Sequence, residues 1–364
     1  MIQEERRGSR RRLLGSLALA ISGALLGAGL VAWRTHTLPF ADSRCWDSVS
    51  SGDLDALFGG GDTGASEVRP AWTPNGVEGR GSLDGTCRVT SGDRQLDIHV
   101  HRLTGGLGKD NLPWAEAFLS ASLTPLGHGL LGMASDTRAW VALPSGCVDP
   151  SAFSGYAVVD VAMGYDGFWD SRSRDAQITL RKALARTAVH VTNGSMAALG
   201  CSGSLPEPGG SDPAPTPRPV GADRRICGVA GVRLPRDVGS NPSVRMTSGT
   251  DDPVRTCDVV AGDSDHPQYR LETVRRDGLG GAFAGLESST GPGIPAEGRR
   301  DMVGAYAPTL AVVYAKCRDD SVLFMAQQKD GTHGYTFIRQ AFPAYVAAEA
   351  GRLGCGPLEI RIPD

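Results

Sequence analysis

The side chains that could carry chemistry begin with two histidines in the segment LDIHVHRL. His99 and His101 are two positions apart, and Asp97 precedes them by the same step. Alternate residues of a strand share a face, so this row offers half of a metal site. The alternative is a solvent-facing or hydrogen-bonded pair. The positions 170 residues later hold Tyr269 and Leu271, which favours this second interpretation.

A second group is the aromatic turn GYDGFWD at 164–170, which we expect between a strand and a helix. Aromatic faces beside carboxylates suit sugar stacking or a hot spot for a protein partner. The alternative is that the rings pack beneath the following helix. The candidate binding residues of this turn are Tyr165, Asp166, Phe168, Trp169 and Asp170.

The sequence lacks the short catalytic signatures G-x-S-x-G, S-x-x-K and H-E-x-x-H. The segment GGLGKD at 105–110 fails as a phosphate loop, because Asp110 stands where Ser or Thr must bind magnesium. We therefore expect no catalytic residue, no metal and no cofactor, and we expect the protein not to be an enzyme.

The eight cysteines form a doubled frame. The stretches GTCRVTSGD at 85–93 and RTCDVVAGD at 255–263 share the motif T-C-x-V-x-x-G-D, and each of its cysteines is followed by another after 60 residues, at Cys147 and Cys317. No C-x-x-C is present, so metal knuckles and redox motifs are unsupported. We expect structural disulfides and an oxidising compartment.

The order of the cysteines limits their pairing. Confining four to each half leaves three connectivities per half. The 60-residue interval is constant, while the flanking intervals differ, 42 against 30 and 54 against 38. A constant interval indicates a rigid core and variable intervals indicate loops. We therefore favour the pairs Cys45–Cys87, Cys147–Cys201, Cys227–Cys257 and Cys317–Cys355, each stabilising by about 3–4 kcal/mol in the chain-entropy model.

The N-terminus predicts a membrane anchor. Residues 1–12 hold five arginines and two glutamates, and Leu13 to Trp33 is uncharged and long enough to cross a bilayer as a helix. The positive-inside rule places residues 1–12 in the cytoplasm and 34–364 outside. The alternative is a cleaved signal, since SRRRLLG at 9–15 is similar to a twin-arginine export signal.

Length and charge bound the remaining possibilities. The chain has 364 residues, a net charge of −3, 40% apolar and 21% charged residues, which is typical of a globular protein with two or three domains. No basic stripe lies beyond the N-terminus, which argues against a nucleic-acid partner.

The elements that must position these residues occur twice. Each half shows alternating strands, a Gly-rich segment, two further strands, an Asp-Gly turn and a helix that ends at Leu-Gly-Cys. This order predicts an α+β fold in which each domain has an antiparallel sheet, a closing helix and two disulfides. The predicted domains are 40–203 and 225–364, joined by an extended Pro-rich linker at 204–224.

Two amphipathic stripes predict the closing helices. The first comprises Leu180, Leu184, Ala188 and Val191. The second comprises Phe342, Val346, Ala350 and Leu353. Pro343 fits the second helix only if it lies in the first turn.

The first half resembles actinobacterial envelope domains of unknown function that are related in shape to PsbP-like α/β sandwiches. CWDSVSSGDLDALFGG at 45–60 looks like their first cysteine and short helix, and Cys87, Cys147 and Cys201 follow in order. The fourth cysteine closes the helix instead of opening it, and the second half has LPRDVG at 234–239 in place of the short helix. The resemblance implies an extracytoplasmic location and no known activity.

Together these patterns favour a membrane-anchored, non-enzymatic binding or scaffold module of the cell envelope. Its expected partners are membrane lipid, through the N-terminal helix, and an envelope protein or glycan. One alternative is an envelope enzyme that acts on glycans or cell-wall material, and another is an exported protein with a cleaved signal. A third is a structural spacer without a pocket.

Overall fold

The computed structural model describes most of the chain beyond the predicted anchor. The described residues are 44–74, 81–103, 111–147, 157–164, 173–209, 215–236, 241–247, 253–261, 267–275, 279–280, 282–283, 285–295, 302–317, 320–329 and 336–363. Residues 44–364 form one compact unit. No helix within the described ranges is long and apolar enough to cross a membrane, and the predicted anchor, 13–33, lies outside them.

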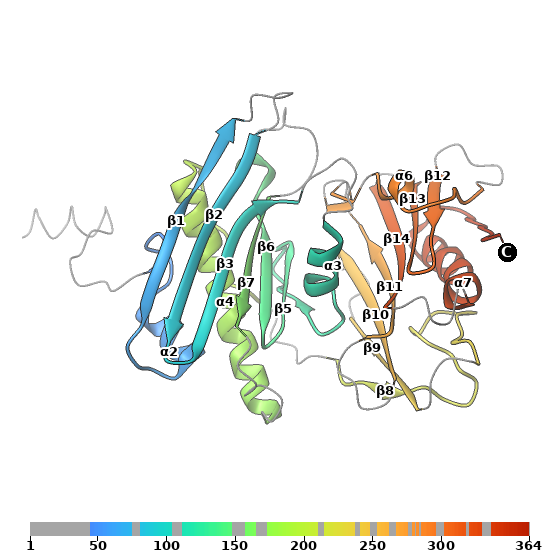
Figure 1. Ribbon diagram of the computed structural model, residues 1–364, viewed down its shortest axis with the longest axis horizontal. Coiled ribbons are helices and arrows are strands. Elements are labelled where there is room, and N and C mark those ends of the chain that lie inside the picture. Colours follow the sequence, from blue (N-terminus) through green and yellow to red (C-terminus); the bar gives the residue numbers. More distant parts are fainter. Residues whose placement is uncertain are drawn as a thin grey trace, which may run out of the picture. The chain divides into compact units, whose positions relative to one another are not determined.

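The first repeat, residues 44–203, contains a seven-stranded antiparallel sheet with a long helix on one face (Figure 1). Its strands are β1 Gly64–Pro74, β2 Gly81–Ser91, β3 Arg94–Arg102, β4 Thr124–Pro125, β5 Gly132–Ala134, β6 Arg138–Ala142 and β7 Ala157–Met163. Its helices are α2 Ser51–Phe58, α3 Leu112–Phe118, the 3-10 turn η2 Ser145–Cys147 and α4 Arg174–Ala198.

The second repeat, residues 225–364, has the same design, and its sheet gains one short strand from the preceding linker. The strands of this sheet are β8 Arg218–Pro219, β9 Pro242–Met246, β10 Val254–Ala261, β11 Tyr269–Val274, β12 Met302–Tyr306, β13 Leu310–Cys317 and β14 Asp320–Gln328. Its helices are α6 Leu286–Ser289 and α7 Thr336–Leu353.

The two sheets share one topology over six strands. The first runs in the order β1-β2-β3-β7-β6-β5, and the second runs in the order β9-β10-β11-β14-β13-β12. Each adds one two-residue strand, β4 or β8, at opposite ends of this common order. The duplication visible in the sequence is therefore a duplication of strand order.

The register of the strands matches as well. In the first sheet Cys87 faces Ile98, which faces Val161, which faces Ala139. In the second sheet the corresponding row is Cys257, Leu271, Ala326 and Ala311. Each row points toward its own long helix, because its members belong to the core cluster that also contains that helix. T-C-x-V-x-x-G-D thus lies on the same strand of each repeat.

Four disulfides are present, two in each repeat. They join Cys45 to Cys87, Cys147 to Cys201, Cys227 to Cys257 and Cys317 to Cys355. These are the pairs that the spacing of the cysteines favoured. Each repeat has one bridge from its first segment to the second strand and one from a central part to the end of the long helix.

The long helices bury the predicted stripes. Residues 180, 184, 188 and 191 of α4 and residues 342, 346 and 350 of α7 are buried, and Leu353 is partly buried against the same core. The prediction that Pro343 lies in the first turn was wrong, because α7 begins at Thr336 and Pro343 is an interior residue. Apolar packing of the preceding turns therefore outweighs the backbone hydrogen bond that proline cannot make.

The short helix α2 shows why its segment folds locally. Ser50 accepts a hydrogen bond from the backbone of Asp53, while the Asp53 side chain accepts one from the Ser50 backbone, which is a capping box. Gly59 ends the helix in the left-handed conformation, with φ of 76°. The second repeat has turns at 227–231 and an isolated bridge between Arg225 and Arg233 instead of a helix.

The described parts of the predicted linker, 204–209 and 215–224, contact both repeats. Asn193 on α4 exchanges two hydrogen bonds with the backbone of Leu205, and the amide of Gly209 donates to the carbonyl of Leu126. Further on, β8 pairs with β9. Backbone pairing therefore holds this segment on the surface of both repeats.

Candidate functional site

A third core cluster joins the two repeats. It combines α3 and the face of the first sheet that points away from α4 with the corresponding face of the second sheet. Its largest members include Trp114, Trp140, Phe283 and Met325. Each sheet is therefore covered by its own long helix on one face and by this shared layer on the other.

The C-terminal end of α3 docks directly on strands β10 and β11. Thr256 donates a hydrogen bond to the carbonyl of Leu119, at 2.5 Å, and the Ser120 hydroxyl and the Ala121 amide each donate to Asp258, at 3.0 Å. The carbonyls at the end of α3 have no partner within the helix, so these contacts satisfy one of them. The same contacts fix the position of α3 on the sheet of the second repeat.

Three ionisable residues, Asp258, Arg270 and Glu272, lie beneath this contact. Arg270 donates to Asp258 through Nε, at 2.5 Å, and to the carbonyl of Glu116 through Nη1, at 2.9 Å. Glu272, fully buried, lies 3.9 Å from Arg270, and its carboxyl oxygens have no hydrogen-bond partner. Burial raises the pKa of Glu272 to about 8, although Arg270 opposes the shift, so this carboxyl is mostly protonated at neutral pH.

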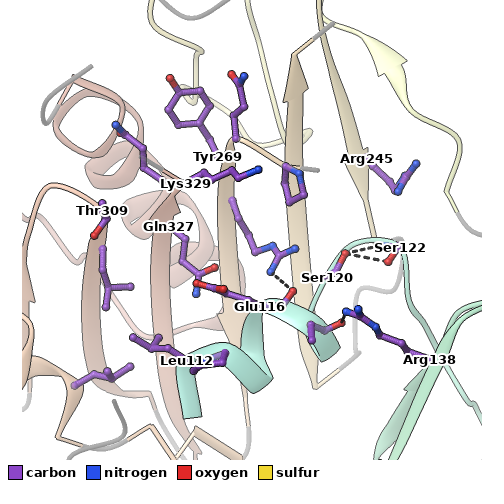
Figure 2. Close-up of a pocket in the computed structure, with 18 of the residues that line it drawn as sticks. Leu112, Glu116, Ser120, Ser122, Arg138, Arg245, Tyr269, Thr309, Gln327 and Lys329 are labelled. Carbon is purple, nitrogen blue, oxygen red and sulfur yellow. Dashed lines mark hydrogen bonds between the residues drawn. The ribbon is translucent and has the colours of Figure 1, made fainter. Parts of the chain in front are cut away.

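A groove of about 1020 Å³, with polar and apolar residues in its lining, opens beside α3 between the two repeats (Figure 2). The first repeat contributes Leu112, Pro113, Glu116, Ala117, Ser120, Ser122, Asp136, Thr137, Arg138 and Gln177. The second contributes Arg245, Pro267, Gln268, Tyr269, Arg270, Leu286, Thr290, Ala307, Thr309, Leu310, Gln327, Gln328 and Lys329. Neither repeat builds this groove alone.

The groove carries hydrogen-bonding groups in place of aromatic surfaces. Four glutamines line it, and an amide side chain carries both donors and an acceptor. Tyr269 is the one aromatic lining residue, and its buried ring packs on Phe337 with centroids 4.4 Å apart. The lining therefore suits a polar, extended ligand better than a stacked sugar ring.

The predicted histidine row has a partner that its own strand did not indicate. His101 Nε2 lies 2.6 Å from an oxygen of Asp160 on β7, and Trp114 Nε1 donates to the same oxygen at 3.2 Å. His99 Nδ1 lies 3.9 Å from the other oxygen. Burial lowers the pKa of His101, but the hydrogen bond and charge of Asp160 outweigh it and raise this pKa overall.

Asp97 is directed to other partners. It accepts hydrogen bonds from Arg88, at 2.7 Å, and from Gln95, at 2.5 Å. Within the described ranges no cluster of three or more His, Cys, Asp or Glu side chains is arranged to hold a metal ion. Of the predicted row, Asp97 therefore forms an ion pair with Arg88 on β2, and His101 forms a hydrogen bond with Asp160 on β7.

The aromatic turn at 165–170 lies outside the described residues, as does most of its counterpart at 329–337. The structure instead reveals the groove and Asp160, which the sequence analysis missed. One available signal was the single acid in the apolar strand AVVDVAM at 157–163, and another was the charged pair in YRLETV at 269–274. A lone charge in a buried strand usually has a partner on another element.

Comparisons with protein-family models, with curated proteins and with solved structures gave no match. The candidate site is therefore interpreted from its own geometry.

Proposed function

We propose that this protein is a membrane-anchored, extracytoplasmic and non-enzymatic binding module, and that the groove between its repeats holds a polypeptide segment of an envelope partner. The observation that supports this most is the joint construction of the groove. The two repeats have the same fold, and α3 packs between them. Together they create a groove that neither repeat has alone.

The chemistry of the lining favours a polypeptide. A peptide backbone presents alternating donors and acceptors, and the Gln268 amide and the Thr309 hydroxyl in the groove lining match both. Docking the backbone on side-chain amides leaves the ligand's own side chains to set specificity.

Binding can be tested by panning a random-peptide display library against the full chain with its disulfides intact. We expect selected peptides to lose binding to the variant Thr309→Trp, whose indole would obstruct the groove on the side of the second repeat. Thr73→Trp, an exposed residue on β1, is the matched control and should bind normally. Selected peptides that bind both variants equally would place the binding surface elsewhere.

The location is proposed on separate grounds. The four disulfides fit an oxidising environment. The basic residues 1–12 and the apolar run 13–33 support an anchor with its N-terminus in the cytoplasm. Protease added to intact cells should remove residues 34–364, and complete protection would refute this topology.

One observation favours a second candidate, an enzyme that acts on glycans. Glu116 and Asp136 both line the groove, and paired carboxylates beside a cleft are the machinery of most glycoside hydrolases. Release of reducing ends from cell-wall glycans by the full chain, abolished by Glu116→Gln, would replace the binding proposal with this one.

A further inference from the structure

The charges of the groove occur in a definite order. Figure 2 shows Arg245 and Arg138 on one side with Ser120 and Ser122, Lys329 and Thr309 on the opposite side, and Glu116 between them. Asp136 and Arg270 also line the groove, so the order positive, negative, positive applies to the line from Arg245 past Glu116 to Lys329.

Arg245 is the cation at one end of the groove. It lies beside Asp258, a carboxylate that already accepts hydrogen bonds from other residues. Arg245 faces Asp258 directly across β9 and β10. Asp258 accepts from Arg270, Ser120 and Ala121, so it does not need Arg245. Arg245 Nε has no hydrogen-bond partner in the described part of the chain.

The cation at the other end, Lys329, is positioned by its backbone. Its amide donates to the carbonyl of Gln268 at 2.9 Å, which fixes the end of β14 against the start of β11. The Lys329 residue is exposed, and no salt bridge joins it to another described residue. Its ammonium group is therefore available to a ligand.

The centre of the groove carries a negative charge. Arg270 is paired with Asp258 at 2.5 Å, so the Glu116 carboxylate adds an anion that this pair does not neutralise. Glu272 adds little negative charge at neutral pH because burial keeps it protonated. Glu116 itself is exposed on α3, where a ligand can reach it.

We propose that the groove selects a polypeptide segment with alternating charge, in which an acidic residue lies at each end and a basic residue lies between them. This inference rests on the proposed function of the groove. The acidic residues would pair with Arg245 and Lys329, and the basic residue with Glu116. Partly enclosed pairs of this kind discriminate between partners more than they add affinity.

The test uses synthetic peptides of one composition and two charge orders. The alternating peptide places Glu, Lys and Glu at intervals of two to six Gly/Ser residues, and the segregated peptide places both glutamates at one end. We expect the alternating peptide to bind the full chain roughly tenfold more tightly in fluorescence anisotropy at low salt.

A charge reversal tests whether Glu116 and Lys329 recognise the charge order of the peptide. The double variant Glu116→Lys with Lys329→Glu should lose the preference for the alternating order, while Lys182→Glu, an exposed residue on α4 outside the groove, should keep it. Equal binding of both orders, with both blocked by Thr309→Trp, would overturn the alternation and leave the peptide-binding proposal standing. Absence of peptide binding, or competition by a neutral oligosaccharide alone, would overturn both.

Discussion

Asp258 faces Arg270 across strands β10 and β11, and both side chains are buried, with 3% and 5% of their surface exposed. The equivalent positions of the first repeat, one residue beyond Cys87 and one before Ile98, hold the opposite charges, Arg88 and Asp97. That pair is 58% and 24% exposed. Both repeats therefore have a cross-strand ion pair at the same position of the sheet, and α3 covers this pair only in the second repeat.

This difference in burial predicts that the two ion pairs contribute differently to the free energy of unfolding. Asp258→Asn should lower the free energy of unfolding by about 3–5 kcal/mol, because it leaves Arg270 charged and buried. Asp97→Asn, which breaks the exposed counterpart, should cost no more than about 1 kcal/mol. Urea denaturation of both variants measures the contrast. Equal losses would show that the contact with α3 does not bury the pair in solution.

Glu272 predicts a pH dependence of stability. The pKa of this carboxyl is about 8 in the folded protein and about 4.5 when the chain is unfolded. The unfolded state therefore releases its proton first as pH rises. The stability that protonation provides is complete below pH 4.5 and is lost by up to about 1.4 kcal/mol per pH unit as pH approaches 8.

The variant Glu272→Gln tests this dependence, since the neutral amide resembles the protonated acid. Its stability relative to the wild-type protein should increase between pH 5 and pH 8, as measured by thermal unfolding at several pH values. A constant difference across this range would show that Glu272 is solvated or paired in solution.

Asp53 joins α2 to α4 and sets the charge of a histidine. Its carboxylate lies 3.0 Å from Arg186 Nε and 3.0 Å from His190 Nδ1. The hydrogen bond that His190 Nδ1 donates to the Asp53 carboxylate is the main cause that raises the pKa of His190. Burial raises the pKa of Asp53, but hydrogen bonds with His190 and Ser50 outweigh it and lower this pKa overall.

Replacing Asp53 by Asn should therefore cost more at pH 5.5 than at pH 8.5. The stability from charged His190 is present below its unfolded pKa, about 6.5, and is lost as pH rises through the higher folded value. An NMR titration should show that the pKa of His190 falls in Asp53→Asn, and an unchanged titration would contradict the pairing.

The equivalent disulfides predict equivalent losses. The paired substitutions Cys45→Ser with Cys87→Ser and Cys227→Ser with Cys257→Ser open loops of 42 and 30 residues. Each should destabilise by about 3–4 kcal/mol in the chain-entropy model. Denaturation under non-reducing conditions measures both. A loss confined to one repeat would indicate that the two bridges do not constrain the chain in the same way.

Several parts of the fold could be predicted from sequence because they depend on local pattern. The stripe that includes Leu184 and Ala188 fixed the buried face of α4, since helical spacing places these residues on one side. The constant interval between Cys87 and Cys147 indicated a rigid core. The start of α7 could not be predicted, because packing around Pro343 overrides the local rule for proline.

The sequence by itself therefore determined the repeat, its strand and helix periods and the cysteines that close it, because spacing along the chain encodes them. Only the tertiary structure decided that α3 covers the second sheet, that Asp160 is the partner of His101, and that Arg245, Glu116 and Lys329 line one groove. These residues belong to elements far apart in sequence. The packing of the two buried sheet faces against one apolar layer decides which of these side chains come into contact. The spacing of residues along the chain does not encode this packing.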